Sequence, residues 1–114
     1  MKALLIPVDE APREVDLPDG GGTQFMNSLR ALIGADCAER LWITDRWEAW
    51  LDEDGRSAGK PVNQGATRLA RSFGWQSSLP GPVVIVGLEK DADRLVSLSR
   101  DQVRAILRTI AGAG

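Results

Sequence analysis

The 114-residue sequence contains no histidine and no tyrosine. Histidine is the commonest general base and the commonest metal-binding side chain, so its absence excludes every Ser-His and Cys-His nucleophile arrangement. The absence of tyrosine removes phenolic acid–base chemistry as well. Any reaction would depend on lysine, acidic or serine side chains alone. We therefore expect a protein that is not an enzyme and that carries no cofactor.

Cysteine and long apolar segments are also scarce. The single cysteine, Cys37, excludes an internal disulfide and a cysteine-rich metal site, and we expect it to pack as a small buried hydrophobe. The apolar run of residues 3–8 is followed at once by charged residues and is too short for a signal peptide. No segment reaches the length of a membrane span. These features predict a cytoplasmic protein with no membrane contact.

The composition is that of an ordinary globular protein. Hydrophobic residues make up 43 % of the chain and charged residues 26 %, which argues against disorder. The formal net charge is −2, and the basic residues alternate with acidic ones instead of forming the basic stripe of a nucleic-acid-binding protein. A chain of this length can bury one core and not two. We expect a single domain over residues 1–114 that does not bind nucleic acid.

Periodic patterns of apolar residues predict a mixture of strands and helices. Strands are expected at residues 3–8, 13–17, 38–44, 47–52, 83–86 and 94–98. Apolar stripes at helical spacing predict three helices, which begin at the capping residues Thr23, Asn63 and Ser99. Their expected core positions are Phe25, Leu29, Leu32, Ile33, Ala66, Leu69, Ala70, Phe73, Val103, Ile106, Leu107 and Ile110. Because strands and helices do not alternate strictly, we expect an α+β fold, with one mostly antiparallel sheet and about three packed helices.

Local turn chemistry predicts how these elements are joined. The Asp9–Pro12 turn is expected to connect the first two strands as a hairpin. Gly34 supplies the left-handed residue that ends the first helix, and a capping box at 99–102 begins the last one. Asp54-Gly55 is typical of a second hairpin turn. The acidic residues before it lack the spacing of a calcium loop, so we expect a solvated hairpin and no metal site.

Tryptophan is the unusual aromatic residue of this chain, because three of the four fall within nine residues, at Trp42, Trp47 and Trp50. Trp47 has the parity of the apolar residues of its strand, so we assign it to the core. Trp50 has the parity of Glu48 and Asp52, so we expect all three on an exposed face. Exposed tryptophan is enriched at interface anchors. Trp50, Glu48 and Asp52 are therefore a candidate partner-binding surface, with burial of both rings as the alternative.

The segment DEDGRSAGKPVNQGATRLA, residues 52–70, has two interpretations. In the structural one, an acidic turn reverses the chain, Gly59 and Pro61 form a bend, and Asn63 caps the next helix. In the functional one, basic side chains and the amides of a helix N-terminus form a small anion site. The residues of that candidate ligand site are Lys60, Asn63, Arg68 and Arg71.

Four segments carry a resemblance to a known family; they are KALLIPVDEAPREVDL, LDEDGRSAGKPVNQGAT, GPVVIVG and SLSRDQV. In this order they resemble a small domain family of unknown function found in phages and actinobacteria. That family typically shows a Gly-x-Pro-x-Asn segment, a glycine-flanked valine strand and a Ser-Leu-Ser/Thr helix start. In this chain Lys60 stands where the family usually has an apolar residue.

The resemblance supplies a context and not a mechanism, because no activity is established for that family. Together with the missing catalytic residues, it implies a non-enzymatic accessory domain of a phage or mobile element. Such a domain would act by binding an unidentified protein or a second copy of itself. The alternative is that it binds or sequesters a small anionic, nucleotide-like ligand through residues 60–71.

Overall fold

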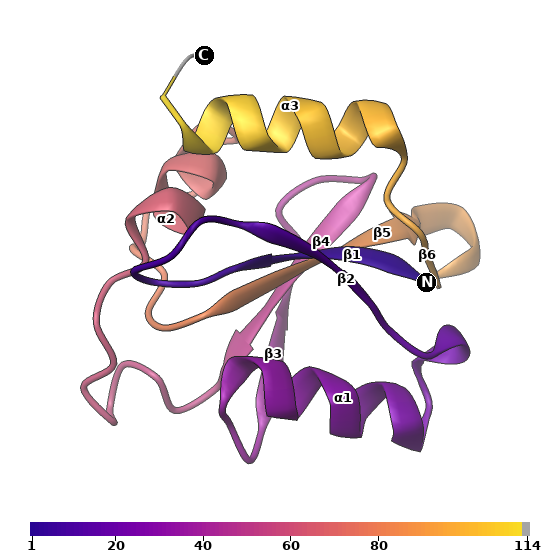
Figure 1. Cartoon of the computed structure of the whole chain (residues 1–114), viewed down its shortest axis with the longest axis horizontal. Coiled ribbons are helices and arrows are strands. Elements are labelled where there is room, and N and C mark those ends of the chain that lie inside the picture. The colour runs from indigo at the N-terminus through magenta and orange to yellow at the C-terminus, as the bar shows by residue number, and fades with distance from the viewer. Residues whose placement is uncertain (113–114) are drawn as a thin grey trace.

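Helices cover both faces of a six-stranded sheet in the computed structural model, which describes residues 1–112 (Figure 1). The strands are β1 (Lys2–Ile6), β2 (Arg13–Asp16), β3 (Ala38–Leu41), β4 (Trp47–Asp52), β5 (Val83–Glu89) and β6 (Arg94–Val96). The helices are α1 (Thr23–Ile33), α2 (Gln64–Arg71) and α3 (Arg100–Ile110), with short 3₁₀ turns η1 (Asp19–Gly21) and η2 (Lys90–Ala92). The strand order is β2-β1-β5-β4-β3, with β6 paired to β5, and the neighbouring strands are antiparallel. The expected α+β fold is confirmed.

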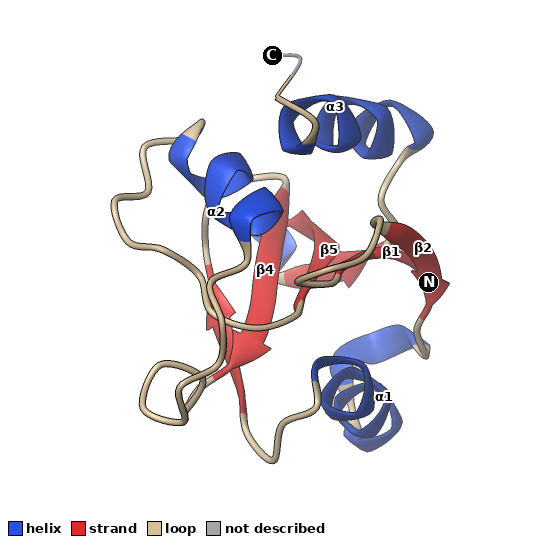
Figure 2. Cartoon of the chain, turned by 60° about the vertical axis from the view of Figure 1, so that its left-hand side comes forward, coloured by secondary structure: helices blue, strands red, loops and turns tan. Residues whose placement is uncertain are grey.

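Each face of the sheet packs against its own layer of helix (Figure 2). On the face covered by α1, the buried residues are Ala3, Leu5, Trp50, Val84 and Val86 from the strands and Phe25, Leu29 and Ile33 from the helix. On the face covered by α2 and α3, they include Leu4, Ile6, Trp47, Ala49, Leu51, Val83 and Ile85 from the strands and Leu69, Val103 and Ile106 from the helices. Because β1, β4 and β5 have neighbours on both edges and helices on both faces, alternate residues of these strands are buried in opposite layers.

Two of the three helices begin at the N-terminal capping residue that the sequence predicts. Ser99 Oγ accepts from the Gln102 amide at 3.1 Å and Gln102 Oε1 accepts from the Ser99 amide at 2.8 Å, so the capping box of α3 is confirmed. Asn63 caps α2 by accepting from the Ala66 amide at 3.0 Å. The prediction that Thr23 caps α1 is wrong: Gly22 is the capping residue, without a side-chain bond, and Thr23 already lies in the helix.

Two expected core positions on the helices are exposed. Leu107 lies at the border of the α3 stripe, because Val103, Ile106 and Ile110 already fill the side that faces the sheet. Phe73 follows the end of α2, so the helical spacing that placed it in the core no longer applies. Both predictions of core packing are therefore wrong.

Among residues 1–112, no helix has the length and apolar character needed to cross a membrane.

The connections between strands differ from the prediction at one turn. β1 and β2 form the expected hairpin, with Lys2 opposite Asp16. The second hairpin joins β3 to β4 through residues 42–46, and β3 ends earlier than predicted. Asp54-Gly55 belongs to a turn that leads to α2, so its assignment to a hairpin is wrong. The expectation that Cys37 is buried is also wrong, because it is exposed in the bend before β3.

Candidate functional site

The side chain of Lys60, the first residue of the predicted anion site, forms an ion pair and hydrogen bonds with other segments of the protein. Its Nζ lies 2.8 Å from Asp52 Oδ2 and donates to the carbonyl oxygens of Ile33 and Gly34 at 3.3 and 3.0 Å. These carbonyls belong to the C-terminal end of α1, where a positive charge is favourable. The pKa of the Asp52 carboxyl is lowered, chiefly by the hydrogen bond from Lys60 and secondly by the hydrogen bond from the Asp54 amide. Lys60 therefore joins β4 to the end of α1.

Asn63 is fully buried and uses both ends of its amide within the fold. Its Nδ2 donates to the carbonyl oxygens of Ile6 and Gly81 at 2.8 and 2.9 Å, while its Oδ1 caps α2. A buried amide with these partners is satisfied by the protein itself. It fixes the start of α2 against the end of β1 and the segment before β5. The structural interpretation of this segment accounts for Asn63.

The two arginines of the predicted anion site lie on α2. Arg68 Nη1 donates to the carbonyl oxygen of Ile110 at the C-terminal end of α3, and Arg71 is exposed. Lys60 and Asn63 make contacts inside the fold, whereas Arg68 contacts a different helix end. The structure therefore does not bring the four side chains together around one solvent-accessible space.

The predicted partner surface on β4 is buried. Trp50, Glu48 and Asp52 are 9 %, 0 % and 8 % exposed. The prediction that Trp47 and Trp50 lie on opposite faces is confirmed, because they belong to opposite core layers. The prediction that Trp50, Glu48 and Asp52 form an exposed face is wrong, since β4 lies between β3 and β5 and helices pack on both faces of the sheet. An interface of these three side chains would require the domain to open.

Glu48 is a buried carboxylate with three side-chain donors. Its Oε2 accepts from Arg40 Nε at 2.5 Å and from Trp42 Nε1 at 3.0 Å, and its Oε1 accepts from Trp50 Nε1 at 3.0 Å. Burial of a carboxylate is costly unless it is paired and hydrogen-bonded, and these donors meet that condition. Glu48 therefore fixes the orientation of one guanidinium group and two indole rings.

Arg40 lies between the two tryptophans that share Glu48. Its guanidinium carbon is 5.1 Å from the centre of the Trp42 ring and 5.9 Å from that of Trp50, within the range of cation–π contacts. Its Nη2 also donates to Asp93 Oδ1 at 2.7 Å. Burial acts to lower the pKa of Arg40, but the hydrogen bonds to Glu48 and Asp93 outweigh it, and the pKa is raised. The guanidinium therefore stays charged within this cluster.

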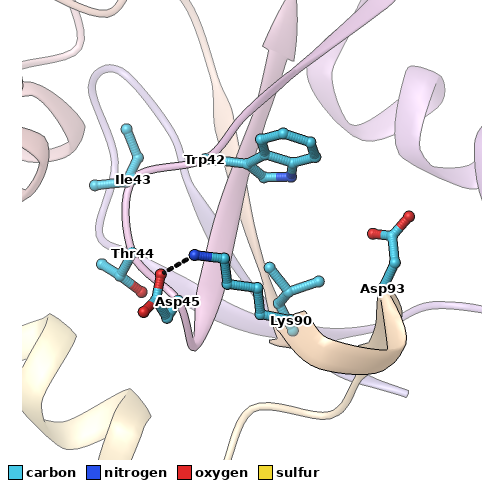
Figure 3. A pocket seen from close by; sticks show the side chains of 7 residues that line it. Trp42, Ile43, Thr44, Asp45, Lys90 and Asp93 are labelled. Atoms are coloured by element: carbon cyan, nitrogen blue, oxygen red, sulfur yellow. Dashed lines mark hydrogen bonds and ion pairs between the residues drawn. The ribbon is translucent and has the colours of Figure 1, made fainter.

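Trp42 is the surface residue of this cluster, and its side chain is 68 % exposed. Its N–H donates to Glu48, and its ring contacts the Arg40 guanidinium. It borders a cavity of about 390 Å³ (Figure 3). The lining residues, which we call the Trp42 site, are Trp42, Ile43, Thr44, Asp45, Leu88, Lys90 and Asp93. Lys90 Nζ donates to Asp45 Oδ1 at 3.0 Å. The volume lies in the range of small-ligand and side-chain pockets.

Asp93 holds an uncommon backbone conformation beside this cavity. Its φ of 45° lies in the left-handed region. Within residues 1–112, the other residues with a positive φ are glycines. Aspartate tolerates this region better than most residues, and its amide donates to the carbonyl oxygen of Lys90 at 3.0 Å. The turn after η2 thereby directs the Asp93 carboxylate toward Arg40. No local pattern in the sequence points to a role for Arg40 or Asp93 in a site.

A comparison with known protein families finds a match over nearly the whole chain. The sequence model of a family described as a domain of unknown function (DUF3846) matches residues 1–111. That span includes each strand and helix of the structure. No curated protein and no solved structure matches the chain.

Proposed function

Because the chain belongs to the DUF3846 family, whose function is unknown, we propose a function from its surface: a non-enzymatic accessory domain that binds another protein through the Trp42 site. We propose further that this domain belongs to a phage or mobile element, and the resemblance of its sequence motifs to those of a phage and actinobacterial family supports this. The observation that carries the proposal is the indole of Trp42, which is exposed and at the same time held in one orientation by Glu48 and Arg40.

A fixed, exposed tryptophan is a suitable contact for a protein partner. Tryptophan presents a large apolar area, and its exposure to water is unfavourable until a partner covers it. Side chains that are ordered before binding lose less conformational entropy when the complex forms. For these reasons tryptophan is enriched among the residues that dominate binding energy. Trp42 combines the exposed area with the prior ordering.

The surroundings of Trp42 have the arrangement of an interface. Ile43 and Leu88 supply apolar surface, and Asp45, Lys90 and Asp93 supply charged groups around it. An apolar centre with a polar rim is typical of protein–protein contacts. Trp42 also directly follows β3, which is an edge strand, since within residues 1–112 it pairs with β4 alone. A partner can therefore contact the ring and the strand edge together.

The chemistry of the chain supports a binding function more than catalysis. The sequence offers no histidine or tyrosine for proton transfer. Glu48, the fully buried carboxylate that binds the Trp42 N–H, accepts hydrogen bonds from three side chains. Lys90, which lines the cavity, is paired with Asp45 on the surface. These groups hold Trp42 and shape the rim.

Comparative capture tests the proposal. Immobilised wild-type protein, Trp42→Ala and Phe73→Ala are exposed to an extract of cells that naturally produce the chain, and bound proteins are quantified by mass spectrometry. Phe73 is the matched control, because it is an exposed aromatic residue that packs against Trp47 and does not line the Trp42 site. We expect at least one captured protein, or additional copies of the chain, to fall about tenfold or more with Trp42→Ala and to persist with Phe73→Ala. Equal capture by all three proteins would show that Trp42 is not the contact.

A further inference from the structure

Arg40 makes cation–π contacts with two indole rings, since its guanidinium carbon lies 5.1 Å from the centre of Trp42 and 5.9 Å from that of Trp50. Both indole N–H groups donate to Glu48, so a negative charge lies at the positive edge of each ring. The π faces, which attract cations, remain for other contacts. Arg40 covers part of Trp42 but does not line the Trp42 site. Trp42, which is mostly exposed, is thus the member of this group that lines the cavity.

The charges that line the cavity favour a cation as well. Asp45 and Asp93 contribute two carboxylates, and Lys90 contributes one ammonium group, which is already paired with Asp45. Asp93 Oδ1 accepts from Arg40, and within residues 1–112 its Oδ2 receives no hydrogen bond from the protein. Both carboxylates are largely exposed and can accept from an incoming donor. A mostly exposed indole and an aspartate with a spare carboxylate oxygen thus line the same cavity.

We infer that the Trp42 site binds a cationic side chain of the partner, an arginine whose guanidinium stacks on Trp42 and donates to Asp93; this inference rests on the proposed function. Arginine fits because its planar group can stack on an aromatic ring and donate to a carboxylate at the same time. Its aliphatic stem can pack against Ile43 and Leu88, the apolar residues of the site. The partner's arginine would then make a cation–π contact with Trp42 of the kind that Arg40 already makes with this ring.

Titration with matched tripeptides tests this inference. The full chain is labelled with ¹⁵N, and the indole Nε1–H signals of its four tryptophans are followed by NMR. The Trp42 signal is identified by its loss in Trp42→Phe. The probes are acetyl-Gly-X-Gly-amide peptides in which X is Arg, Leu or Glu. We expect the Arg peptide to shift the Trp42 signal in a saturable way, with a dissociation constant roughly in the millimolar range and about tenfold below that of the Leu peptide.

Two charge-neutralising variants separate a local contact from general attraction. Asp93→Asn keeps the size of the side chain and tolerates the left-handed backbone, and it should weaken binding of the Arg peptide about fivefold without changing the Leu peptide. Asp91→Asn removes the same charge from the neighbouring η2 turn, outside the Trp42 site. It should leave the affinity for the Arg peptide within about twofold.

The outcomes distinguish this inference from the proposed function. A Leu or Glu peptide that binds at Trp42 more tightly than the Arg peptide overturns the inference, yet Trp42 remains a contact site and the proposed function stands. If no peptide shifts the Trp42 signal, the inference is wrong and the capture experiment alone decides the proposed function. Equal weakening by Asp91→Asn and Asp93→Asn also overturns it, because attraction would then be diffuse.

Discussion

Trp42 and Glu48 connect the surface of the protein to its interior, since Trp42 Nε1 donates to Glu48 Oε2 at 3.0 Å although the tryptophan is 68 % exposed and the glutamate is fully buried. The same carboxylate accepts from Trp50 and Arg40. The orientation of the exposed ring therefore depends on a buried network. Changes inside the network should alter the surface, whereas changes at the surface should cost little stability.

Glu48→Ala should lower the free energy of unfolding by about 3 kcal/mol, because it leaves the Arg40 guanidinium and two indole N–H groups without their shared acceptor. The measurement is urea denaturation at pH 7. Glu39→Ala is the matched control, as this glutamate is exposed on the adjacent strand and its loss should stay within about 0.5 kcal/mol. A cost below about 1 kcal/mol for Glu48→Ala would contradict a structural role for the buried carboxylate.

The three clustered tryptophans should respond differently to truncation. Trp47→Ala and Trp50→Ala should each cost about 3–5 kcal/mol, because each ring is buried in one of the two core layers. Trp42→Ala removes a mostly exposed ring and one hydrogen bond to Glu48, and it should cost about 1 kcal/mol. Thermal melts of the three variants check this order. A fully tolerated Trp50→Ala would place that ring on the outside, against the structure.

The Lys60–Asp52 pair should make stability depend on pH in the acidic range. The pKa of Asp52 is lowered from its ordinary value of 3.8, chiefly by the hydrogen bond from Lys60. A carboxyl whose pKa is lower in the folded than in the unfolded protein stabilises the fold at pH values above its ordinary pKa. This stabilisation is lost as the pH falls through the lowered pKa of the folded state. Lys60→Met should therefore destabilise the domain at pH 7, and the difference from wild type should shrink below about pH 4.

Urea denaturation of wild type and Lys60→Met at pH 7 and pH 3 measures that dependence. Lys2→Met provides the control, because Lys2 pairs with Asp16 where both side chains are mostly exposed. Exposed pairs contribute little, so Lys2→Met should behave as wild type at both pH values. A difference between Lys60→Met and wild type that is as large at pH 3 as at pH 7 would mean that Lys60 acts through α1 and not through Asp52.

Gly87→Ala should destabilise the domain by about 1–3 kcal/mol, because an added Cβ would lie 2.6 Å from the Val96 carbonyl oxygen and 2.9 Å from that of Ser97. Both contacts are with backbone, so β6 would have to move away from β5. Gly22→Ala is the comparison, since its Cβ would meet no heavy atom within 4 Å. Thermal melts should show the larger loss for Gly87→Ala, and equal losses would indicate that β6 adjusts freely.

Local signals in the sequence predicted much of this fold. The capping residues Ser99 and Asn63 act as expected because a cap depends on neighbours within three or four residues. The opposite placement of Trp47 and Trp50 followed from the two-residue period of a strand. These inferences succeeded because the interactions that decide them are close in the chain.

The exposure of β4 could not be inferred in the same way. Glu48 and Asp52 give the strand the alternation of a half-exposed one, yet each carboxylate is buried with a partner from another segment. Arg40 reaches Glu48 from β3, and Lys60 reaches Asp52 from the loop before α2. The sequence alone does not distinguish an acidic side chain that is buried with a partner from one that is exposed to solvent. Only the pairing of distant segments distinguishes them.

The Trp42 site depended on strand register and was not predicted. Leu41 lies opposite Ala49, so the next pair along the hairpin places Trp42 beside Glu48. The sequence predicted a strand that continued past Trp42, without the end of β3 that leaves this ring at the sheet border. Asp93 reaches the cluster from the turn after β5. No local pattern connects these three positions.

The place of β5 in the sheet determines when this domain can fold during synthesis. β5 separates the β1–β2 hairpin from the β3–β4 hairpin, so the two hairpins share no strand contact until residues 83–89 have been made. A nascent chain shorter than this holds two unconnected hairpins whose apolar faces lack their neighbour. Folding then requires contacts between segments far apart in the sequence, which slows it. The domain should therefore fold only after most of the chain has left the ribosome, and a stalled chain would be prone to aggregate.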